Sequence, residues 1–285
     1  MVLPRIITAI LLVPIVLPII WVGSFPFFIF VLAITILGFW EYSNMAEQGG
    51  YPNQLVMGIA GSFLILMALF LDGVVLWGPV HKSPSPLFIL MLWTFASFIR
   101  EFFRSDKGHS LLRIMTTLLG VAICGLFLGH LVLFRDLRLV SGEGFKFVGR
   151  EVVFFLVLVI WTTDVGAWLV GKTVGRTKMT PTISPGKTIE GSLGGTLLAC
   201  LVGWIFQQSF LKTAWGPLEA VFYAFCISIT AQISDLVESL AKRSFGVKNS
   251  SELLPGHGGI LDRFDSFIFS APFFYYLLVA TGRFQ

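Results

Sequence analysis

Charge is scarce in this sequence. Only 13% of its 285 residues are Asp, Glu, Lys or Arg, whereas a soluble domain carries roughly 25%. Hydrophobic residues make up 55% of the chain, and the mean hydropathy is +0.85. A chain with so little charge cannot coat a soluble sphere of this size. The composition therefore excludes a soluble enzyme and a disordered chain.

Cysteine is scarce as well. Cys124, Cys200 and Cys226 all lie in apolar segments, and none has a metal-ligand spacing to another. We expect them to be small packing residues, and a disulfide scaffold is excluded. No GxSxG, HExxH or CxxC motif occurs in the chain.

The apolar residues lie in long charge-free segments. A helix needs about 20 residues to cross a hydrocarbon core of roughly 30 Å, so Ile6–Trp40 is long enough for two helices, broken at Trp21–Pro26. Val152–Val170 is apolar except for Asp164. The remaining segments are Gln48–Leu71, Ser83–Ile99, Ile114–Phe134, Gly191–Leu211, Ala220–Ser234 and Ser266–Gly282. These segments lack the alternation of barrel strands. The sequence predicts an all-α polytopic membrane protein with about nine transmembrane helices.

The polar loops predict the organisation and orientation of the chain. Residues 1–135 would form about five N-terminal helices, and residues 136–285 would form the catalytic region that carries both polar motifs. With the N-terminus in the cytoplasm, thirteen of the 20 Lys and Arg residues lie on the inner side. We therefore expect a multi-pass protein of the cell membrane whose active site faces the cytoplasm. The net charge of +4 fits contact with anionic headgroups or phosphates.

The first polar motif lies within Trp161–Gly191. Asp164 interrupts an apolar run, and a carboxylate at membrane depth is costly, so it indicates either a functional group or a packing pair. Downstream, Ser184-Pro185-Gly186-Lys187-Thr188 predicts a turn that leads into a helix. Free backbone N–H groups and Lys187 would suit a phosphate there. The alternative is a helix cap with a lysine that reaches the interface. The motif is not a Walker A loop, because Pro181 stands where a glycine is required.

The second polar motif, Ser234–Ser266, contains two pairs of acids. Asp235 and Glu238 are three residues apart and share a helix face, and Asp262 and Asp265 repeat that spacing at the start of the last span. The pairs could meet in one pocket, where four carboxylates would repel one another unless a cation neutralised them. Oxygen ligands select hard cations, which makes Mg²⁺ the natural candidate.

Basic residues surround these acids. Lys242, Arg243 and Arg263 either form salt bridges to them or hold substrate phosphates. His257, within a glycine-rich turn, could be a base, a phosphate donor or a turn residue. A magnesium site with cationic neighbours points to phosphoryl or nucleotidyl transfer.

The stretch from Ser239 to Asp265 resembles the C-terminal signature of phosphatidate cytidylyltransferases (CDP-diacylglycerol synthases). Ser184–Thr188, with Asp164–Ala167 before it, also resembles that family's pattern. The resemblance implies an enzyme of phospholipid biosynthesis that condenses CTP with phosphatidic acid to CDP-diacylglycerol and pyrophosphate. It implies Mg²⁺ as cofactor, leaves a second cation open, and implies partners in the lipid bilayer rather than nucleic acid. A homodimer is also left open.

The resemblance also implies roles for particular residues. Asp235 and Asp262 would bind the metal, while Glu238 and Asp265 would support it or orient its waters. Lys187 joins these four acids as a catalytic candidate and would neutralise a phosphate. The substrate-binding candidates are the further phosphate neutralisers Arg243 and Arg263, the phosphate neighbours Ser184 and Thr188, the membrane anchor Asp164, and Lys242 and His257. Asn249 stands where the family usually has Asp, which keeps an oxygen ligand but loses the charge. The alternatives are a CTP-dependent lipid kinase, a cytidylyltransferase for another lipid phosphate, and a transporter with Asp164 as its coupling site.

Overall fold

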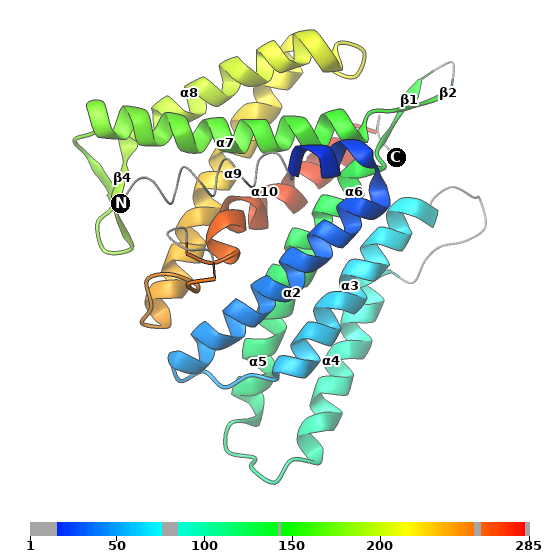
Figure 1. Ribbon diagram of the computed structural model, residues 1–285, viewed down its shortest axis with the longest axis vertical. Coiled ribbons are helices and arrows are strands. Elements are labelled where there is room, and N and C mark those ends of the chain that lie inside the picture. The colour runs from blue at the N-terminus through cyan, green and yellow to red at the C-terminus, as the bar shows by residue number, and fades with distance from the viewer. Residues whose placement is uncertain (1–15, 76–84, 142–143, 254–257, 283–285) are drawn as a thin grey trace. The chain divides into compact units, whose positions relative to one another are not determined.

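Helices account for most of the regular structure, as expected where a bilayer forces each segment to satisfy its own backbone. The computed structural model describes residues 16–75, 85–141, 144–253 and 258–282 (Figure 1). The α-helices with both ends in the described residues are α2 (Ser24–Gln48), α3 (Leu55–Val75), α4 (Pro86–Phe102), α5 (Ser110–Gly120), α6 (Leu131–Arg135), α7 (Gly149–Thr173), α8 (Ile189–Phe206), α9 (Pro217–Ser244) and α10 (Leu261–Ala280). Irregular helical turns η1 (Val121–Phe127) and η2 (Leu128–His130) join α5 to α6, and η3 (Gln207–Leu211) follows α8.

Six helical segments in the described residues are long and apolar enough to cross a membrane. They are Ser24–Gln48, Leu55–Asp72, Ser110–Arg135, Gly149–Thr173, Ile189–Leu211 and Pro217–Ser244. This confirms the all-α multi-pass membrane protein and matches six of the nine predicted spans. Of the other three, the first falls mostly on residues 1–15, outside the described residues. The second is α4, which has 17 residues, and the third is α10, which carries three charges in its first five residues.

The chain divides into two compact units. Unit 1 comprises Met1–Leu133 and Ala241–Phe264, and unit 2 comprises Phe134–Leu240 and Asp265–Gln285. The first boundary lies next to the division predicted after residue 135. Residues 241–264 belong with the N-terminal part, so α9 and α10 each contribute residues to both units.

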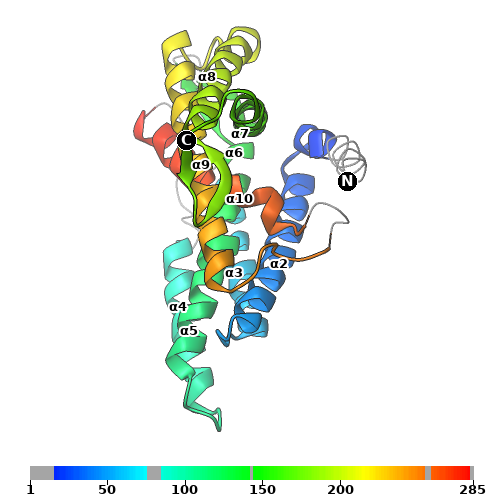
Figure 2. The ribbon, with the colours of Figure 1, turned by 90° about the vertical axis from the view of Figure 1, so that its left-hand side faces the viewer.

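In unit 1, α2, α3, α4 and α5 run side by side (Figures 1 and 2). Buried aromatic residues with a polar end connect these helices, because a buried hydroxyl or indole N–H needs a partner. The Tyr42 hydroxyl donates to the Thr116 carbonyl over 3.0 Å, and the Trp93 indole N–H donates to the Met57 carbonyl over 2.8 Å.

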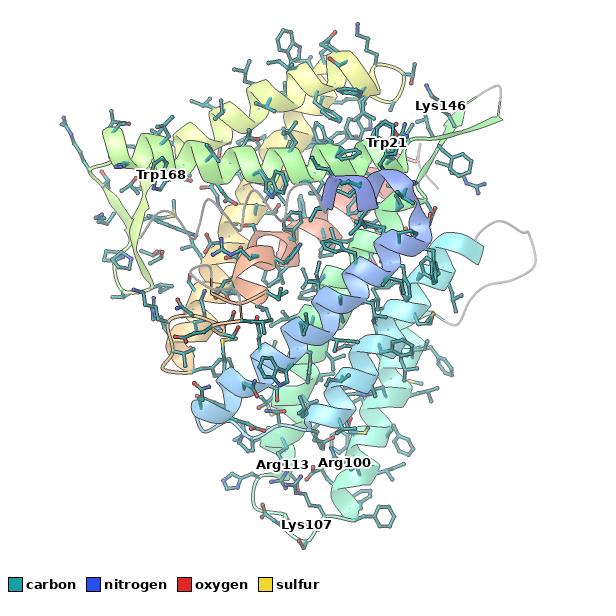
Figure 3. The ribbon with its side chains drawn as sticks, viewed as in Figure 1. Trp21, Arg100, Lys107, Arg113, Lys146 and Trp168 are labelled. Carbon is teal, nitrogen blue, oxygen red and sulfur yellow. The ribbon has the colours of Figure 1, made fainter. Side chains whose placement is uncertain are left out.

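A buried ion pair closes the α4–α5 end of unit 1. Arg113, 3% exposed, donates to Glu101 from Nη2 over 2.9 Å and to Asp106 from Nη1 over 3.1 Å. Gln54 Nε2 donates to the same Glu101 carboxylate over 2.6 Å. Burial alone would raise the pKa of Glu101, but hydrogen bonds from Arg113, Ser110 and Gln54 outweigh it and lower that pKa. Figure 3 labels Arg113 and Arg100 at this end of α4 and α5.

In unit 2, α7 and α8 pack at close range (Figure 1). A β-carbon on Gly195 of α8 would lie 2.5 Å from the main-chain oxygen of Thr163, and one on Gly191 would lie 2.7 Å from that of Ala167. Such small residues let two membrane helices approach closely. Aromatic rings fill the rest of the core, with Phe155 4.9 Å from Trp215 between ring centroids.

Two short antiparallel hairpins complete the fold, β1 (Arg138–Ser141) with β2 (Gly144–Phe147) and β3 (Lys178–Thr180) with β4 (Ser184–Thr188). The predicted turn at Ser184-Pro185-Gly186 was wrong, because these residues form β4 and the turn lies at residues 181–183. Pro185 is compatible with this strand because the hairpin has only edges and the pairing is irregular there.

Candidate active site

Unit 2 brings Lys187 of β4 to Asp235 of α9. Lys187 Nζ lies 2.7 Å from Asp235 Oδ2, and the two side chains are 26% and 29% exposed. The Ser239 hydroxyl, one turn further along α9, donates to Asp235 Oδ1 over 3.4 Å. Asp235 thus has a partner on each carboxylate oxygen. Lys187, which the sequence predicts to bind a phosphate, is paired with Asp235, which the sequence predicts to bind the metal.

A polar network between α8 and α9 fixes the helix that carries Asp235. Gln232 Nε2 donates to Thr196 Oγ1 over 3.0 Å and to Ser228 Oγ over 3.2 Å, and Ser192 donates to Gln232 Oε1. Gln232 precedes Asp235 by three residues, so this network positions the Asp235 turn of α9.

Ser234 connects α9 to α10. Its buried hydroxyl donates to the main-chain oxygen of Asp265 and accepts the Phe269 N–H over 3.2 Å. One carboxylate oxygen of Asp265 accepts the Ser266 N–H over 2.6 Å. Asp265 is therefore fixed beside the turn of α9 that carries Asp235.

Four acids influence one another in unit 2. Burial, and then the negative charges of Asp235, Glu238 and Asp164, raise the pKa of Asp265 well above its ordinary value. Glu238 is only 6% exposed, whereas Asp164 is exposed on α7. A bound cation would relieve the repulsion that these carboxylates exert on Asp265.

The donor set fits a divalent cation in chemistry and in charge. Carboxylate oxygens are the ligands that Mg²⁺ prefers. In the part of the chain that the structure describes, no three His, Cys, Asp or Glu side chains converge as closely as a bound metal requires. These acids therefore suit Mg²⁺ by the type of their ligand atoms and by their negative charge, but the described residues do not form a coordination sphere.

The junction of β4 and α8 is capped by the protein itself. Thr188, 5% exposed, is the N-cap of α8 and accepts the Gly191 N–H on its hydroxyl over 3.1 Å. Glu190 accepts the N–H groups of Arg176 and Thr177, each over 3.1 Å. The helix-cap alternative therefore holds for Thr188, whereas Ser184 begins β4 away from the cap.

In unit 1, Asp262 lies at the start of α10 with both oxygens occupied. Lys242 Nζ donates to Oδ1 over 2.6 Å, while Oδ2 accepts from Ser250 N and Oγ over 3.0 Å and from Gly259 N over 2.9 Å. Burial would raise the pKa of Asp262, but the hydrogen bonds from Lys242, Gly259 and Ser250 lower it. Lys242 thus forms a salt bridge to Asp262, and its binding of a substrate phosphate stays a prediction.

Glu41 of α2 belongs to the same network and was missed from the sequence. It is fully buried, and its oxygens accept from Ser251 Oγ, Ile260 N, Ser250 Oγ and Leu261 N. The available signal was a lone acid directly after the charge-free segment Ile6–Trp40.

The remaining candidates are peripheral or outside the described residues. Arg243 is exposed and donates to the Val247 carbonyl over 3.0 Å, and Arg263 and Asn249 are exposed. His257 lies outside the described residues. Asp262 belongs to unit 1 and Asp235 to unit 2, so their joint role as metal ligands stays a prediction.

Comparison with known proteins places the chain in a family. Residues 3–281 match the model of the cytidylyltransferase family. A protein named phosphatidate cytidylyltransferase from Bacillus subtilis (strain 168) is 34% identical over 288 residues, which cover 96% of each chain. Proteins of that name from Staphylococcus epidermidis (strain ATCC 12228 / FDA PCI 1200) and Staphylococcus aureus (strain COL) are 45% and 43% identical over 133 and 148 residues. These matches span 47% and 49% of this chain and 51% and 56% of the relatives. Since the family model covers almost the whole chain, this protein belongs to the cytidylyltransferase family.

Proposed function

We propose that this protein transfers the cytidylyl group of CTP to phosphatidic acid, giving CDP-diacylglycerol and pyrophosphate. One observation of the structure carries the proposal: Lys187 pairs with Asp235, whose charge acts on Asp265 together with the charges of Glu238 and Asp164. A cation-neutralised acid cluster with an adjacent lysine suits transfer to or from a nucleoside triphosphate. The name of the relatives, phosphatidate cytidylyltransferase, supports phosphatidic acid as the acceptor.

The reaction needs no nucleophile from the protein. An oxygen of the phosphatidate phosphate attacks the α-phosphorus of CTP and forms a new P–O bond. The bond from the α-phosphorus to the bridging oxygen breaks, and pyrophosphate leaves with its electron pair. The attacking phosphate is already an anion, so the protein has to position two anionic substrates and neutralise their charge.

We assign Asp235 as a ligand of Mg²⁺ in unit 2, with Glu238 and Asp265 supporting the ion or its waters. When bound, the ion would supply charge neutralisation at the triphosphate. Lys187 shares Asp235 in this structure. Once Asp235 serves the ion, the Lys187 ammonium would be available to a substrate phosphate. The assignment of Asp262 as a further ligand is supported by the resemblance to the family signature.

The membrane setting suits these substrates. Phosphatidic acid is held in the bilayer by its acyl chains, while CTP is dissolved in the cytoplasm. The excess of Lys and Arg in the loops of one side supports a cell-membrane protein whose site faces the cytoplasm. Arg243 and Arg263, exposed near the ends of α9 and α10, would add positive charge for phosphates. The chemistry requires no second protein chain.

Product analysis tests the proposal. Purified protein in mixed micelles is supplied with CTP, Mg²⁺ and either phosphatidic acid or diacylglycerol. We expect pyrophosphate and a lipid of the mass of CDP-diacylglycerol with phosphatidic acid only. CDP together with a phosphorylated lipid from diacylglycerol would establish the lipid-kinase alternative instead. Uptake of substrate into liposomes without any product would establish a transporter.

A further inference from the structure

Glu41 makes contacts that an ordinary core residue of a membrane helix does not make. Its carboxylate is fully buried, and its hydrogen bonds all go to a segment about 210 to 220 residues away in the sequence. Oε1 accepts from Ser251 Oγ over 2.6 Å and from Ile260 N over 2.9 Å. Oε2 accepts from Ser250 Oγ over 3.1 Å and from Leu261 N over 2.8 Å.

Two of these donors belong to the beginning of α10. The first N–H groups of a helix have no partner inside the helix and need one from outside. Leu261 is the first residue of α10 and Ile260 precedes it, so the Glu41 carboxylate caps this helix from α2. A negative charge at that end is also favoured by the helix dipole. Glu41 therefore fixes where α10 begins.

The same network includes Asp262. The Ser250 hydroxyl lies 3.1 Å from Glu41 Oε2 and 3.0 Å from Asp262 Oδ2. It has one proton, so it donates to one acid at a time and connects the two. Lys242 completes the network with its 2.6 Å bond to Asp262.

The glycines before α10 make room for this arrangement. A β-carbon on Gly259 would collide with both Ser250 Oγ and Glu41 Oε2. Gly258 has φ of +80°, a conformation that other residues rarely adopt, and a β-carbon there would meet the Asp262 carboxylate. Gly258 and Gly259 are thus each required to be glycine, for separate reasons, next to the contact between Glu41 and the start of α10.

We infer that Glu41 is a positioning residue for Asp262. By anchoring Ser250, Ser251 and the first N–H groups of α10, it holds the Asp262 carboxylate and its Lys242 partner in one orientation. The inference rests on the proposed function in so far as Asp262 serves the reaction. A displacement of about 1 Å at a reacting group can cost roughly 100-fold in rate, so loosening this anchor should act on turnover.

The test compares Glu41→Gln with Glu47→Gln, a matched change at an exposed acid of the same helix. In Glu41→Gln, the new amide nitrogen faces a backbone N–H whichever way it is turned, so one donor loses its acceptor. We expect the Ile260 and Leu261 amides to exchange hydrogen roughly 10- to 100-fold faster, as for loss of hydrogen bonds to a charged group. We expect kcat to fall roughly 100-fold with KM for CTP near the wild-type value. Glu47→Gln should change neither quantity.

A second variant keeps the test decisive if Glu41→Gln does not fold. Ser251→Ala removes a single donor to Glu41 and should change the same two quantities in the same direction, by less. Unchanged exchange at residues 260 and 261 in the folded variants would overturn the anchoring role. Faster exchange with an unchanged kcat would overturn the positioning role. If wild-type protein makes no CDP-diacylglycerol, the proposed function fails, while the exchange measurement still decides the anchor.

Discussion

Substitution of Lys187 can distinguish a catalytic role of this residue from a purely structural one. Its ammonium is 2.7 Å from Asp235, but the two side chains keep 26% and 29% of their surface exposed. The Lys187 Nζ atom itself is buried, so the pair lies between an exposed one, which contributes about 1 kcal/mol or less, and a fully buried one, whose breaking costs about 3 to 5 kcal/mol. Lys187→Met should therefore fold, with an unfolding free energy about 1 to 3 kcal/mol below that of wild type.

The expected effect on activity is larger. Loss of one preorganised group that stabilises charge in a transition state costs about 100- to 1,000-fold in kcat, or about 3 to 4 kcal/mol. If Lys187 neutralises a substrate phosphate, pyrophosphate release should fall by that factor. If the pair with Asp235 is only a structural contact, activity should follow the change in stability.

The assay measures initial rates of pyrophosphate release with phosphatidic acid, CTP and Mg²⁺, alongside thermal unfolding of the same samples. Lys178→Met is the matched control, because Lys178 is an exposed lysine on the paired strand β3. We expect Lys178→Met to retain the wild-type rate. Wild-type activity in folded Lys187→Met would refute the proposed role of Lys187.

Three further predictions concern stability. Arg113→Met should destabilise the protein by about 3 to 5 kcal/mol, because it leaves the Glu101 carboxylate, 4% exposed, without its charge partner; an unchanged unfolding midpoint would contradict this. Gly195→Val should lower the midpoint by the equivalent of about 1 to 3 kcal/mol or more, since the added atoms meet the α7 backbone at 2.5 Å; a stability equal to wild type would show that α7 and α8 are not in close contact. The pKa of Asp262 is lowered, so its stabilising effect is complete above the ordinary carboxyl range and is lost as pH falls through the lowered pKa. Asp262→Asn should therefore be less stable than wild type at neutral pH and approach it below about pH 4; parallel pH profiles of the unfolding midpoint would refute that assignment.

The helical architecture was predictable because a bilayer requires long apolar segments, which can be read directly from the sequence. The acid pairs were predictable for a similar reason, since a three-residue spacing places two side chains on one helix face. Asp235 and Glu238 of α9 do lie in one unit with Asp164 and Asp265.

Long-range partners were not predictable in this way. Glu41 contacts residues 209 to 220 positions away, and nothing local in the sequence indicates this pairing. The strand at Ser184–Thr188 was missed because Pro185 and Gly186 favour a turn locally. Its partner β3 contains Lys178 and Thr180, whose polar pattern gives little strand signal. The return of residues 241–264 to unit 1 likewise depends on tertiary contacts.

The central claim is that the α-phosphorus of CTP is transferred to phosphatidic acid with the help of Asp235. The most direct measurement follows radioactive phosphate from CTP into the lipid extract, with label at the α or the γ position, in wild type and Asp235→Asn. We predict that wild-type protein places α-label in lipid only when both phosphatidic acid and Mg²⁺ are present, that γ-label never enters lipid, and that folded Asp235→Asn loses the transfer. Entry of γ-label into lipid, or wild-type transfer by Asp235→Asn, would contradict the account.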